Sequence, residues 1–317
     1  MYVSKDDVTV VVPTLNEEEA IGSVIQEVKE AGYRNILVVD GYSTDGTAKI
    51  AELNGCSVIF QHSKGKCGAV ETAIENVTTP YMLVMDGDCT YDPKDIENFL
   101  AHAEKYDQII GARVNGRKNI PRLNRFGNWL ITNAFNLLMG TKLSDVCSGM
   151  YLINTDVARQ LELNTKGFDV EVEIAAQTAT SGIVTDVPIA YRRRIGRQKL
   201  SSLKHGFRII RTVFSLARNY NPALVFSGLV ALAVIPASII LGWVAFEVLL
   251  NGVWHSGYAL TGLMLLVLAS QGLAVATIAL LLRRMEKRMM RQTRGEGVGS
   301  RKYMLTTVID QQKRRQS

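Results

Sequence analysis

The chain has 317 residues, enough for one large domain or two modest ones with a buried core. Its net charge is +6, but Lys and Arg gather at the edges of apolar segments, which indicates anionic lipid headgroups as partner and excludes nucleic acid. Cys56, Cys67, Cys89 and Cys147 form no CxxC pair or metal spacing, and no secretory signal is apparent, so we expect reduced, buried thiols.

Strand-length apolar runs alternate with helical segments in the first half of the chain. Strands are predicted at 8–12, 36–40, 57–61 and 81–85. Asn16 is expected to cap the first helix, which should run to about Ala31, and further helices are expected from about residue 44 and over 65–77. This alternation is typical of βαβ units, so we predict an α/β domain with a mostly parallel sheet. Right-handed crossovers place the carboxyl end of every parallel strand at one edge.

Polar residues collect at that edge. Asn16 and Glu17 follow the first strand, Asp40 ends the second, and Asp86 and Asp88 follow the fourth. Ligands of open α/β sheets bind beyond the carboxyl ends of the strands. A carboxylate at position 40 can accept hydrogen bonds from a ribose or a base, and the last two acids can hold Mg²⁺ or Mn²⁺ on a diphosphate. The alternative for each acid taken alone is an ordinary turn or helix cap.

The turn after the first strand excludes a dinucleotide fingerprint. It reads Pro13-Thr14-Leu15-Asn16-Glu17 and contains no glycine, whereas G-x-G-x-x-G would be required there.

Three ordered motifs carry a resemblance to a known family. Residues 11–18 read VVPTLNEE, residues 38–47 read VVDGYSTDGT, and residues 85–88 read MDGD. Together they resemble family 2 glycosyltransferases of the Rossmann-like GT-A fold, and within that family the dolichyl-phosphate sugar synthases, over roughly residues 8 to 205. By this resemblance, the nucleotide sugar would contact Pro13, Thr14, Asn16, Glu17, Asp40, Asp86, Gly87 and Asp88, and the metal would contact Asp86 and Asp88. The mannosyl synthases usually carry a Gln two residues after the second Asp, and Thr90 in that place argues against GDP-mannose as donor.

Further segments resemble motifs of the same family. Residues 111–113 resemble its Gly-x-Arg motif, residues 145–149 its Asp-x-x-Ser-Gly motif, and residues 194–200 its Arg-x-Gly-x-x-Lys-Leu segment. The resemblance implies that the acceptor and the phosphates contact Arg113, Ser148, Arg194 and Lys199. The expected catalytic residues are Asp88, Asp145 and Arg113, with Asp145 orienting the acceptor or the sugar. The attack would be in line, with inversion at the anomeric carbon.

The last third of the chain has the composition of a membrane anchor. Two apolar segments, 223–250 and 258–282, each exceed the roughly 20 residues that cross a bilayer. Pro236 is expected to kink the first segment, and Glu247 is expected at headgroup level. The segment 202–218 has the pattern of an amphipathic helix that lies in the interface. Arg and Lys flank the pair of spans but are absent from the link 251–257, which predicts a cytoplasmic domain and tail.

A further helix is predicted over 122–140, where Leu123, Phe126, Leu130, Ala134, Leu137 and Leu138 recur at helical spacing. We favour a core helix here. A helix that rests on the membrane surface is the alternative, since Arg122 and Arg125 stand at its start.

These observations predict four parts: a GT-A domain (1–200), an interfacial helix (201–221), a two-helix transmembrane hairpin (222–283) and a basic tail (284–317). The expected function is hexosyl or N-acetylhexosaminyl transfer from a nucleotide sugar, by preference a UDP-sugar, to dolichyl or polyprenyl phosphate, with Mg²⁺ or Mn²⁺ as cofactor. Self-association through the membrane helices is a further expectation. The alternatives are a GDP-mannose-dependent synthase, a polysaccharide synthase, whose usual Gln-x-x-Arg-Trp segment is missing, and a non-catalytic scaffold.

Overall fold

The computed structural model describes residues 3–163, 170–196 and 222–282, together with Thr212, Ser215 and Met285. The chain forms two compact units, 1–216 and 217–317. Apart from those three single residues, the predicted interfacial helix and basic tail lie outside the described residues, and so does Lys199.

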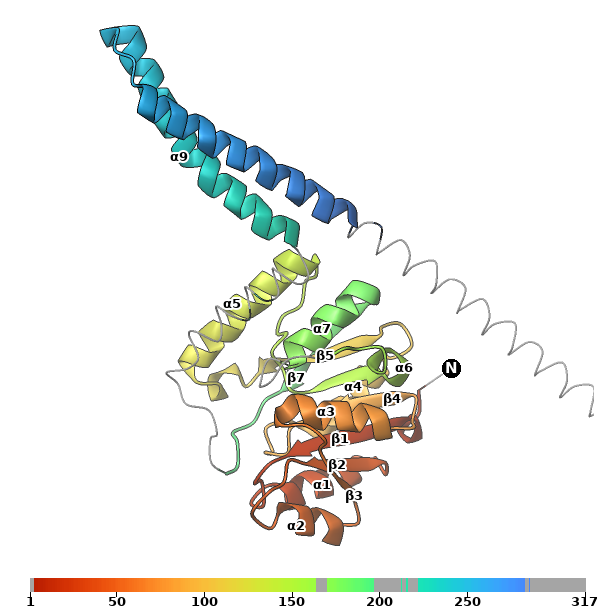
Figure 1. Cartoon of the computed structure of the whole chain (residues 1–317). Coiled ribbons are helices and arrows are strands. Elements are labelled where there is room, and N and C mark those ends of the chain that lie inside the picture. The colour runs from red at the N-terminus through yellow and green to blue at the C-terminus, as the bar shows by residue number, and fades with distance from the viewer. Residues whose placement is uncertain are drawn as a thin grey trace, which may run out of the picture. The chain divides into compact units, whose positions relative to one another are not determined.

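The first unit is built on one seven-stranded sheet with the order β3-β2-β1-β4-β6-β5-β7 (Figure 1). The strands are β1 (Val8–Thr14), β2 (Ile36–Asp40), β3 (Ser57–Phe60), β4 (Tyr81–Val84), β5 (Gln108–Asn115), β6 (Tyr151–Asn154) and β7 (Val184–Ala190). Every neighbouring pair is parallel except the two that involve β6, which runs opposite to both β4 and β5. The predicted mostly parallel α/β sheet is therefore confirmed.

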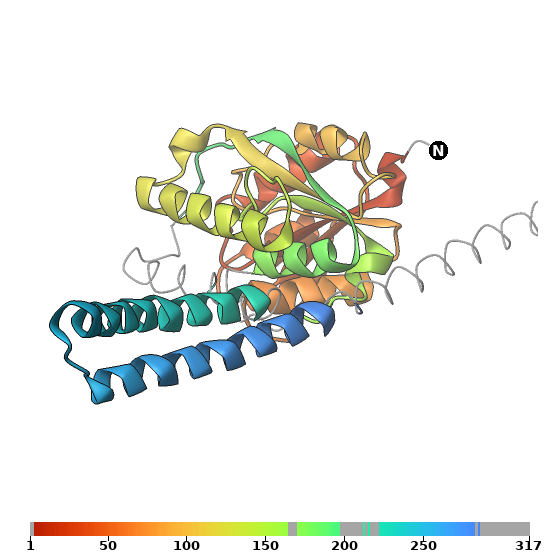
Figure 2. The ribbon, with the colours of Figure 1, turned by 90° about the horizontal axis from the view of Figure 1, so that it is seen from above.

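Helices cover both faces of the sheet, which explains why its central strands are largely apolar instead of alternating. The helices are α1 (Ile21–Glu30), α2 (Thr47–Leu53), α3 (Gly65–Asn76), α4 (Ile96–Leu100), α5 (Arg122–Met139), α6 (Thr155–Ala158) and α7 (Val170–Ser181), with short 3₁₀ turns at Lys5–Asp7, Pro93–Asp95 and Arg117–Asn119. One core forms where α1 and α4 meet the sheet, and α3 and α7 lie on the opposite face (Figure 2).

The chain after β1 departs from the prediction. The first helix begins only at Ile21, and no side chain caps it. Asn16 adopts a left-handed backbone, with φ of 51°, because the chain first makes a turn in which the carbonyl of Glu17 accepts hydrogen bonds from Ala20 and Ile21. The expected capping role of Asn16 was therefore wrong.

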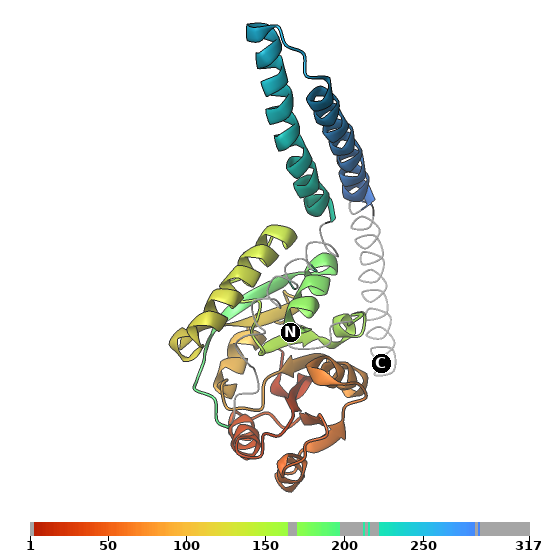
Figure 3. The ribbon, with the colours of Figure 1, turned by 60° about the vertical axis from the view of Figure 1, so that its left-hand side comes forward.

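The second unit contains two long apolar helices, α9 (Pro222–Asn251) and a helix from 256 to 282, which lie side by side (Figure 3). The stretches Phe226–Asn251 and Ser256–Leu282 are long and apolar enough to cross a membrane. A Cβ on Gly262 would lie 2.6 Å from Leu241, and one on Gly272 would lie 2.9 Å from Val230, so glycines let the helices approach closely. Near the link, Trp243 stacks on His255 with ring centroids 4.8 Å apart. Pro236 lies inside α9, which continues through it.

Candidate functional site

The centre of the site is the pair of carboxylates that follows β4. The Asp88 carboxylate is buried and is held by Thr90, whose hydroxyl donates to Oδ1 at 2.5 Å and whose backbone N–H donates to the same oxygen at 3.2 Å. Gly87 separates the two acids, and a Cβ there would lie 3.1 Å from both Thr14 and Val12. The turn can therefore pack closely against β1.

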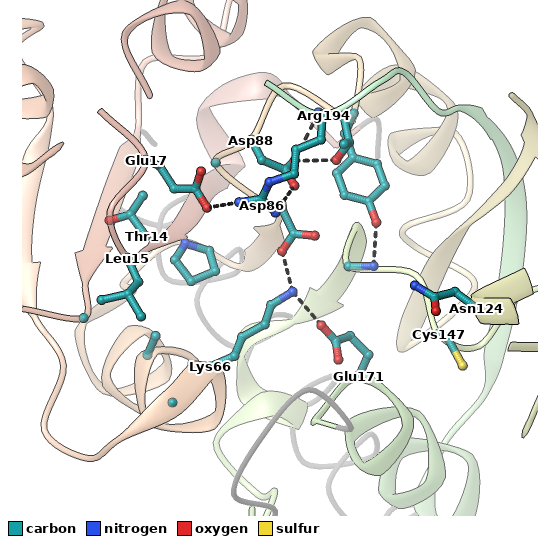
Figure 4. Close-up of a pocket in the computed structure, with 18 of the residues that line it drawn as sticks. Thr14, Leu15, Glu17, Lys66, Asp86, Asp88, Asn124, Cys147, Glu171 and Arg194 are labelled. Carbon is teal, nitrogen blue, oxygen red and sulfur yellow. Dashed lines mark hydrogen bonds and ion pairs between the residues drawn. The ribbon is translucent and has the colours of Figure 1, made fainter. Parts of the chain in front are cut away.

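Each acid of this pair faces a cation that comes from a distant part of the chain (Figure 4). Lys66, in the first turn of α3, places its Nζ 2.5 Å from Asp86 and 2.5 Å from Glu171 of α7. Arg194, which follows β7, donates to Asp88 at 2.9 Å and to Glu17 at 2.5 Å. The acidic cluster, defined as Glu17, Asp86, Asp88, Glu171, Lys66 and Arg194, thus joins four carboxylates to two cations.

Burial and charge set the protonation of this cluster. Burial raises the pKa of Asp88, and repulsion from Asp86 raises it further, against the opposing effects of Thr90 and Arg194. The pKa of Glu171 is raised by burial, which Lys66 partly offsets. Burial by itself would lower the pKa of Lys66, but Asp86 and Glu171 outweigh it and hold that pKa well above its usual value.

The donor set of the acidic cluster fits a divalent cation. With all six groups ionised, the cluster carries two uncompensated negative charges. The described residues contain no group of three or more His, Cys, Asp or Glu side chains arranged to hold a metal. Mg²⁺ is commonly bound by one or two carboxylates, with the remaining ligands supplied by phosphates and water. Asp86 and Asp88, the pair predicted from the sequence, are the two residues that would hold it, and this assignment stays a prediction.

A cavity of about 1070 Å³ opens over the acidic cluster. Such a volume is at the upper end of the range for small-molecule sites. It is lined by the ends of β1 to β4, by the segment after β7 and by the start of α5, with Thr14, Tyr42, Gln61, Asp86, Asp88, Arg113, Asn124, Gly149, Glu171 and Arg194 among the lining residues. The strand ends and α5 thus enclose one large binding space.

A second buried ion pair joins Arg113 of β5 to Asp145. The guanidinium donates to the carboxylate at 2.6 and 3.0 Å and to the carbonyl of Cys147 at 3.0 Å. It also lies 5.3 Å from the ring centroid of Tyr191. Arg113 lines the cavity, whereas Asp145 does not. Asp145 was expected to orient the acceptor or the sugar, and Arg113 to bind phosphate. In the structure the two side chains pair with each other, so the Asp145 carboxylate is already satisfied by Arg113.

The residues predicted to contact the nucleotide divide into two groups. Pro13, Thr14, Glu17 and Gly87 line the cavity. The Asp40 side chain does not, since it is 0% exposed and accepts hydrogen bonds from Thr14 and from the backbone and hydroxyl of Ser43.

Asn16 has a comparable bracing role, because its side-chain oxygen accepts the N–H of Thr44 at 2.7 Å and it is not among the cavity-lining residues. Ser148 is fully buried and accepts the N–H of Met150. Arg194 lines the cavity.

Sequence reasoning missed Lys66 and Glu171. A signal for Lys66 was present, since it follows Gly65 in the first turn of a helix that begins near the strand ends. Two tyrosines were also missed. The Tyr91 hydroxyl accepts the N–H of Gly149 at 2.7 Å, and the ring of Tyr191 packs edge-on against the ring of Tyr91. Gly149 is required here because a Cβ would lie 2.4 Å from Asp86.

The helix α5 forms as predicted, but most of the residues that were expected to lie in the core are exposed. Its expected core stripe is exposed at Leu123, Phe126, Leu130 and Leu137, and Trp129 is exposed beside it. The buried side is instead formed by Gly127, Ile131, Thr132, Phe135 and Leu138, because that face packs toward α7. The first unit thus presents an apolar ridge beside the cavity.

Comparisons with known proteins agree with this arrangement. Residues 9–161 match the family described as Glycosyl transferase family 2. The glycosyltransferase AglJ of Haloferax volcanii is 34% identical over 266 residues, covering 81% of this chain and 88% of the relative. A dolichyl-phosphate hexose transferase of the same organism is 34% identical over 213 residues, covering 66% of this chain and 92% of the relative.

A solved structure shows the same fold. It is glucosyl-3-phosphoglycerate synthase of Mycobacterium tuberculosis in complex with Mn²⁺, UDP-glucose and phosphoglyceric acid, with a TM-score of 0.55 and 19% identity over 66% of this chain and 79% of that one. The likeness confirms the predicted GT-A architecture, and the sequence matches confirm the predicted family. The chain belongs to glycosyl transferase family 2.

Proposed function

We propose that this protein transfers a hexosyl or N-acetylhexosaminyl group from a nucleotide sugar to dolichyl or polyprenyl phosphate at the cytoplasmic face of a membrane. The observation that carries the proposal is one chain that combines the acidic cluster, at the carboxyl edge of the sheet, with two helices long enough to span a bilayer. The name of the H. volcanii dolichyl-phosphate hexose transferase supports the same acceptor class.

The donor side follows from the charges of the cavity. Lys66 and Arg194 can pair with diphosphate oxygens, and Asp86 and Asp88 would then be available to hold a divalent cation. A bound cation would stabilise the negative charge that develops on the departing nucleoside diphosphate. The M. tuberculosis synthase was solved with Mn²⁺ and UDP-glucose, which supports metal use in this fold.

The acceptor side follows from the apolar ridge of α5. Phe126 and Trp129 stack with centroids 5.9 Å apart and stay exposed, while Arg122 and Arg125 stand in the first turn. Aromatic and basic residues together are typical of a helix that lies at a membrane interface. Asn124 and Ile131 of the same helix line the cavity, so a lipid phosphate at the surface would have a direct route to the donor.

The reaction needs little proton removal. The second pKa of a phosphate monoester is about 6, so the lipid phosphate is largely dianionic at neutral pH. Its oxygen would attack the anomeric carbon while the bond from that carbon to the diphosphate breaks, with inversion expected. The protein's task is then to hold and aim two anionic groups, for which Arg113, Arg194 and Lys199 are the proposed residues. Asp145 would act by keeping Arg113 in position.

A UDP-sugar is the preferred donor, because Thr90 does not supply the amide of the mannosyl synthases but fixes the Asp88 carboxylate. A GDP-mannose-dependent enzyme is the second candidate.

The cytoplasmic orientation is proposed from the basic residues that flank the two spans and are absent from the link between them.

The test is an assay of the purified full-length chain in lipid nanodiscs with polyprenyl phosphate, Mg²⁺ or Mn²⁺, and radiolabelled UDP-glucose, UDP-N-acetylglucosamine and GDP-mannose in turn. We expect a charged, lipid-linked sugar from one UDP-sugar and none when unphosphorylated polyprenol replaces the acceptor. Absence of a lipid-linked product with all three donors would contradict the proposal. Product from GDP-mannose alone would establish the second candidate.

A further inference from the structure

We propose that Tyr42 and Gln61 recognise the nucleobase of the donor, with the Tyr42 ring as stacking surface and the Gln61 amide as reader of the base edge. This inference rests on the proposed function, since it names the base subsite of the same cavity.

The backbone of Tyr42 is the first observation. Its φ is 63°, in the left-handed region that glycine adopts freely and a bulky side chain adopts at a cost. The described residues with positive φ other than glycine are Asn16, Tyr42 and Cys89, and all three follow the carboxyl ends of strands at the cavity. Asn adopts this conformation more readily than Tyr does. Strained backbone of this kind is concentrated at functional sites.

The side chain of Tyr42 gains little from burial that would offset the strain. It is 65% exposed, yet it lines the cavity. Its ring stacks on Phe60 at the end of β3, with centroids 5.3 Å apart and an interplanar angle of 25°. Phe60 thereby holds the ring in one orientation and leaves its other face open. A fixed aromatic face at the rim of a polar cavity suits a planar heterocycle.

The Gln61 amide is the second, independent observation. The residue is only 8% exposed and lines the cavity. Among the residues that the structure describes, no hydrogen bond to its side-chain amide is found, so the amide can pair with a ligand in the cavity. Gly41 makes room for this amide, because a Cβ there would lie 3.2 Å from its oxygen. With Asp40 turned inward, Gln61 is a largely buried polar group that this end of the cavity offers to a base.

The position of the pair along the sheet fits a nucleotide. The diphosphate end of the cavity lies at β4, and the strand order then runs through β1 to β2 and β3, where Tyr42 and Gln61 stand. Neighbouring strands are about 4.8 Å apart, so β2 lies about 10 Å from β4. A ribose and one phosphate can bridge that separation. Uracil and guanine both present an acceptor beside an N–H donor, which a Gln amide can match with two hydrogen bonds.

The experiment measures the affinity of the full-length chain in nanodiscs for UDP and for inorganic pyrophosphate, by calorimetry with Mg²⁺ present, alongside the thermal unfolding midpoint. For Tyr42→Gly we expect UDP to bind on the order of tenfold to hundredfold more weakly. Pyrophosphate affinity should be unchanged, because pyrophosphate has no base. The unfolding midpoint should rise, because glycine relieves the left-handed strain. A purely structural role for the ring predicts the opposite shift in stability.

Two further variants sharpen the test. Tyr42→Phe keeps the ring and should bind UDP like the wild type. Gln61→Glu places an acceptor where a donor is needed and should weaken UDP at least tenfold while leaving pyrophosphate alone. Unchanged UDP affinity in Tyr42→Gly, or an equal loss for pyrophosphate, would overturn this inference and leave the proposed function intact. Failure of the wild type to bind UDP, and GDP titrated in the same way, would instead overturn the proposed function.

Discussion

Two buried ion-pair groups among the described residues of the first unit differ in how their charges balance. The acidic cluster has more carboxylates than cations, and the carboxylates of Asp86 and Asp88 line the cavity. The Arg113–Asp145 pair is neutral, bidentate and further held by the carbonyl of Cys147. The first group is therefore suited to exchange partners when charged ligands arrive, and the second to hold the wall of the cavity in place.

The sequence alone does not distinguish the charged residues of the acidic cluster from those of the Arg113–Asp145 pair, but their partners in the structure do. A buried charge pair contributes little net stability but is costly to break, because the remaining charge is left without a partner. Replacing members of the two groups should therefore give opposite patterns of activity and stability. The following predictions test that division.

The largest effect is expected for Asp88→Ala. Loss of a group that stabilises the departing diphosphate should lower the transfer rate on the order of 10³-fold. The rate of sugar transfer to polyprenyl phosphate measures it, and the unfolding midpoint serves as the control for folding. Full activity would remove Asp88 from the mechanism.

Asp145→Ala should act on stability first, and on transfer only through the Arg113 that it holds. It leaves Arg113 buried without its carboxylate, which costs about 3 kcal/mol in free energy of unfolding. Chemical denaturation of the detergent-solubilised chain measures this cost, and Asp145→Asn, which keeps an acceptor, should cost less. If the variant unfolds like the wild type but loses transfer activity, Asp145 acts on substrate and the division fails.

Lys66→Met tests whether the lysine competes with a metal for Asp86. Removing the competing charge should tighten Mn²⁺ binding without nucleotide by roughly tenfold, or about 1.4 kcal/mol after screening. Electron paramagnetic resonance of free Mn²⁺ in a titration gives the affinity, and Lys66→Arg, which keeps the charge, is the matched variant. An unchanged Mn²⁺ affinity would contradict the competition.

Asp45→Asn should have the smallest effect. Asp45 is an acid at the same edge of the sheet, but it does not line the cavity. Burial alone would raise the pKa of Asp45, but hydrogen bonds from Thr47 outweigh it and lower that pKa. The folded-state pKa is thus below the unfolded one, so the stability it contributes is present above pH 3.8 and disappears as the pH falls through the folded-state value. We expect a loss of about 1 kcal/mol at pH 7.

The measurement is the unfolding free energy as a function of pH, with wild type and variant expected to converge at low pH. UDP affinity should stay unchanged. A loss of UDP binding would show that Asp45 also serves the ligand, and not only the acids of the acidic cluster.

The first four strands, most helices and the two long apolar helices were predictable because hydrophobic periodicity and length are local signals, whereas β6 and β7 were not predicted. Residues 36–40 and the segment from 122 are examples: both adopt the predicted element, β2 and α5, almost to the residue. The motifs also placed Asp86 and Asp88 correctly at the end of β4. The buried side of α5 was misjudged, because periodicity gives a stripe but not the neighbour against which it packs.

The pairing of charges could only come from the folded chain. Glu17 and Arg194 are 177 residues apart in sequence, and Lys66 and Asp86 are 20 apart, so no local pattern shows that they meet. The same holds for Asp40, whose direction depends on how Thr14 and Ser43 surround it. The sequence thus specified which polar groups stand at the edge of the sheet. Tertiary packing decided which of them face the cavity and which brace its walls, because burial and partners depend on contacts between distant segments.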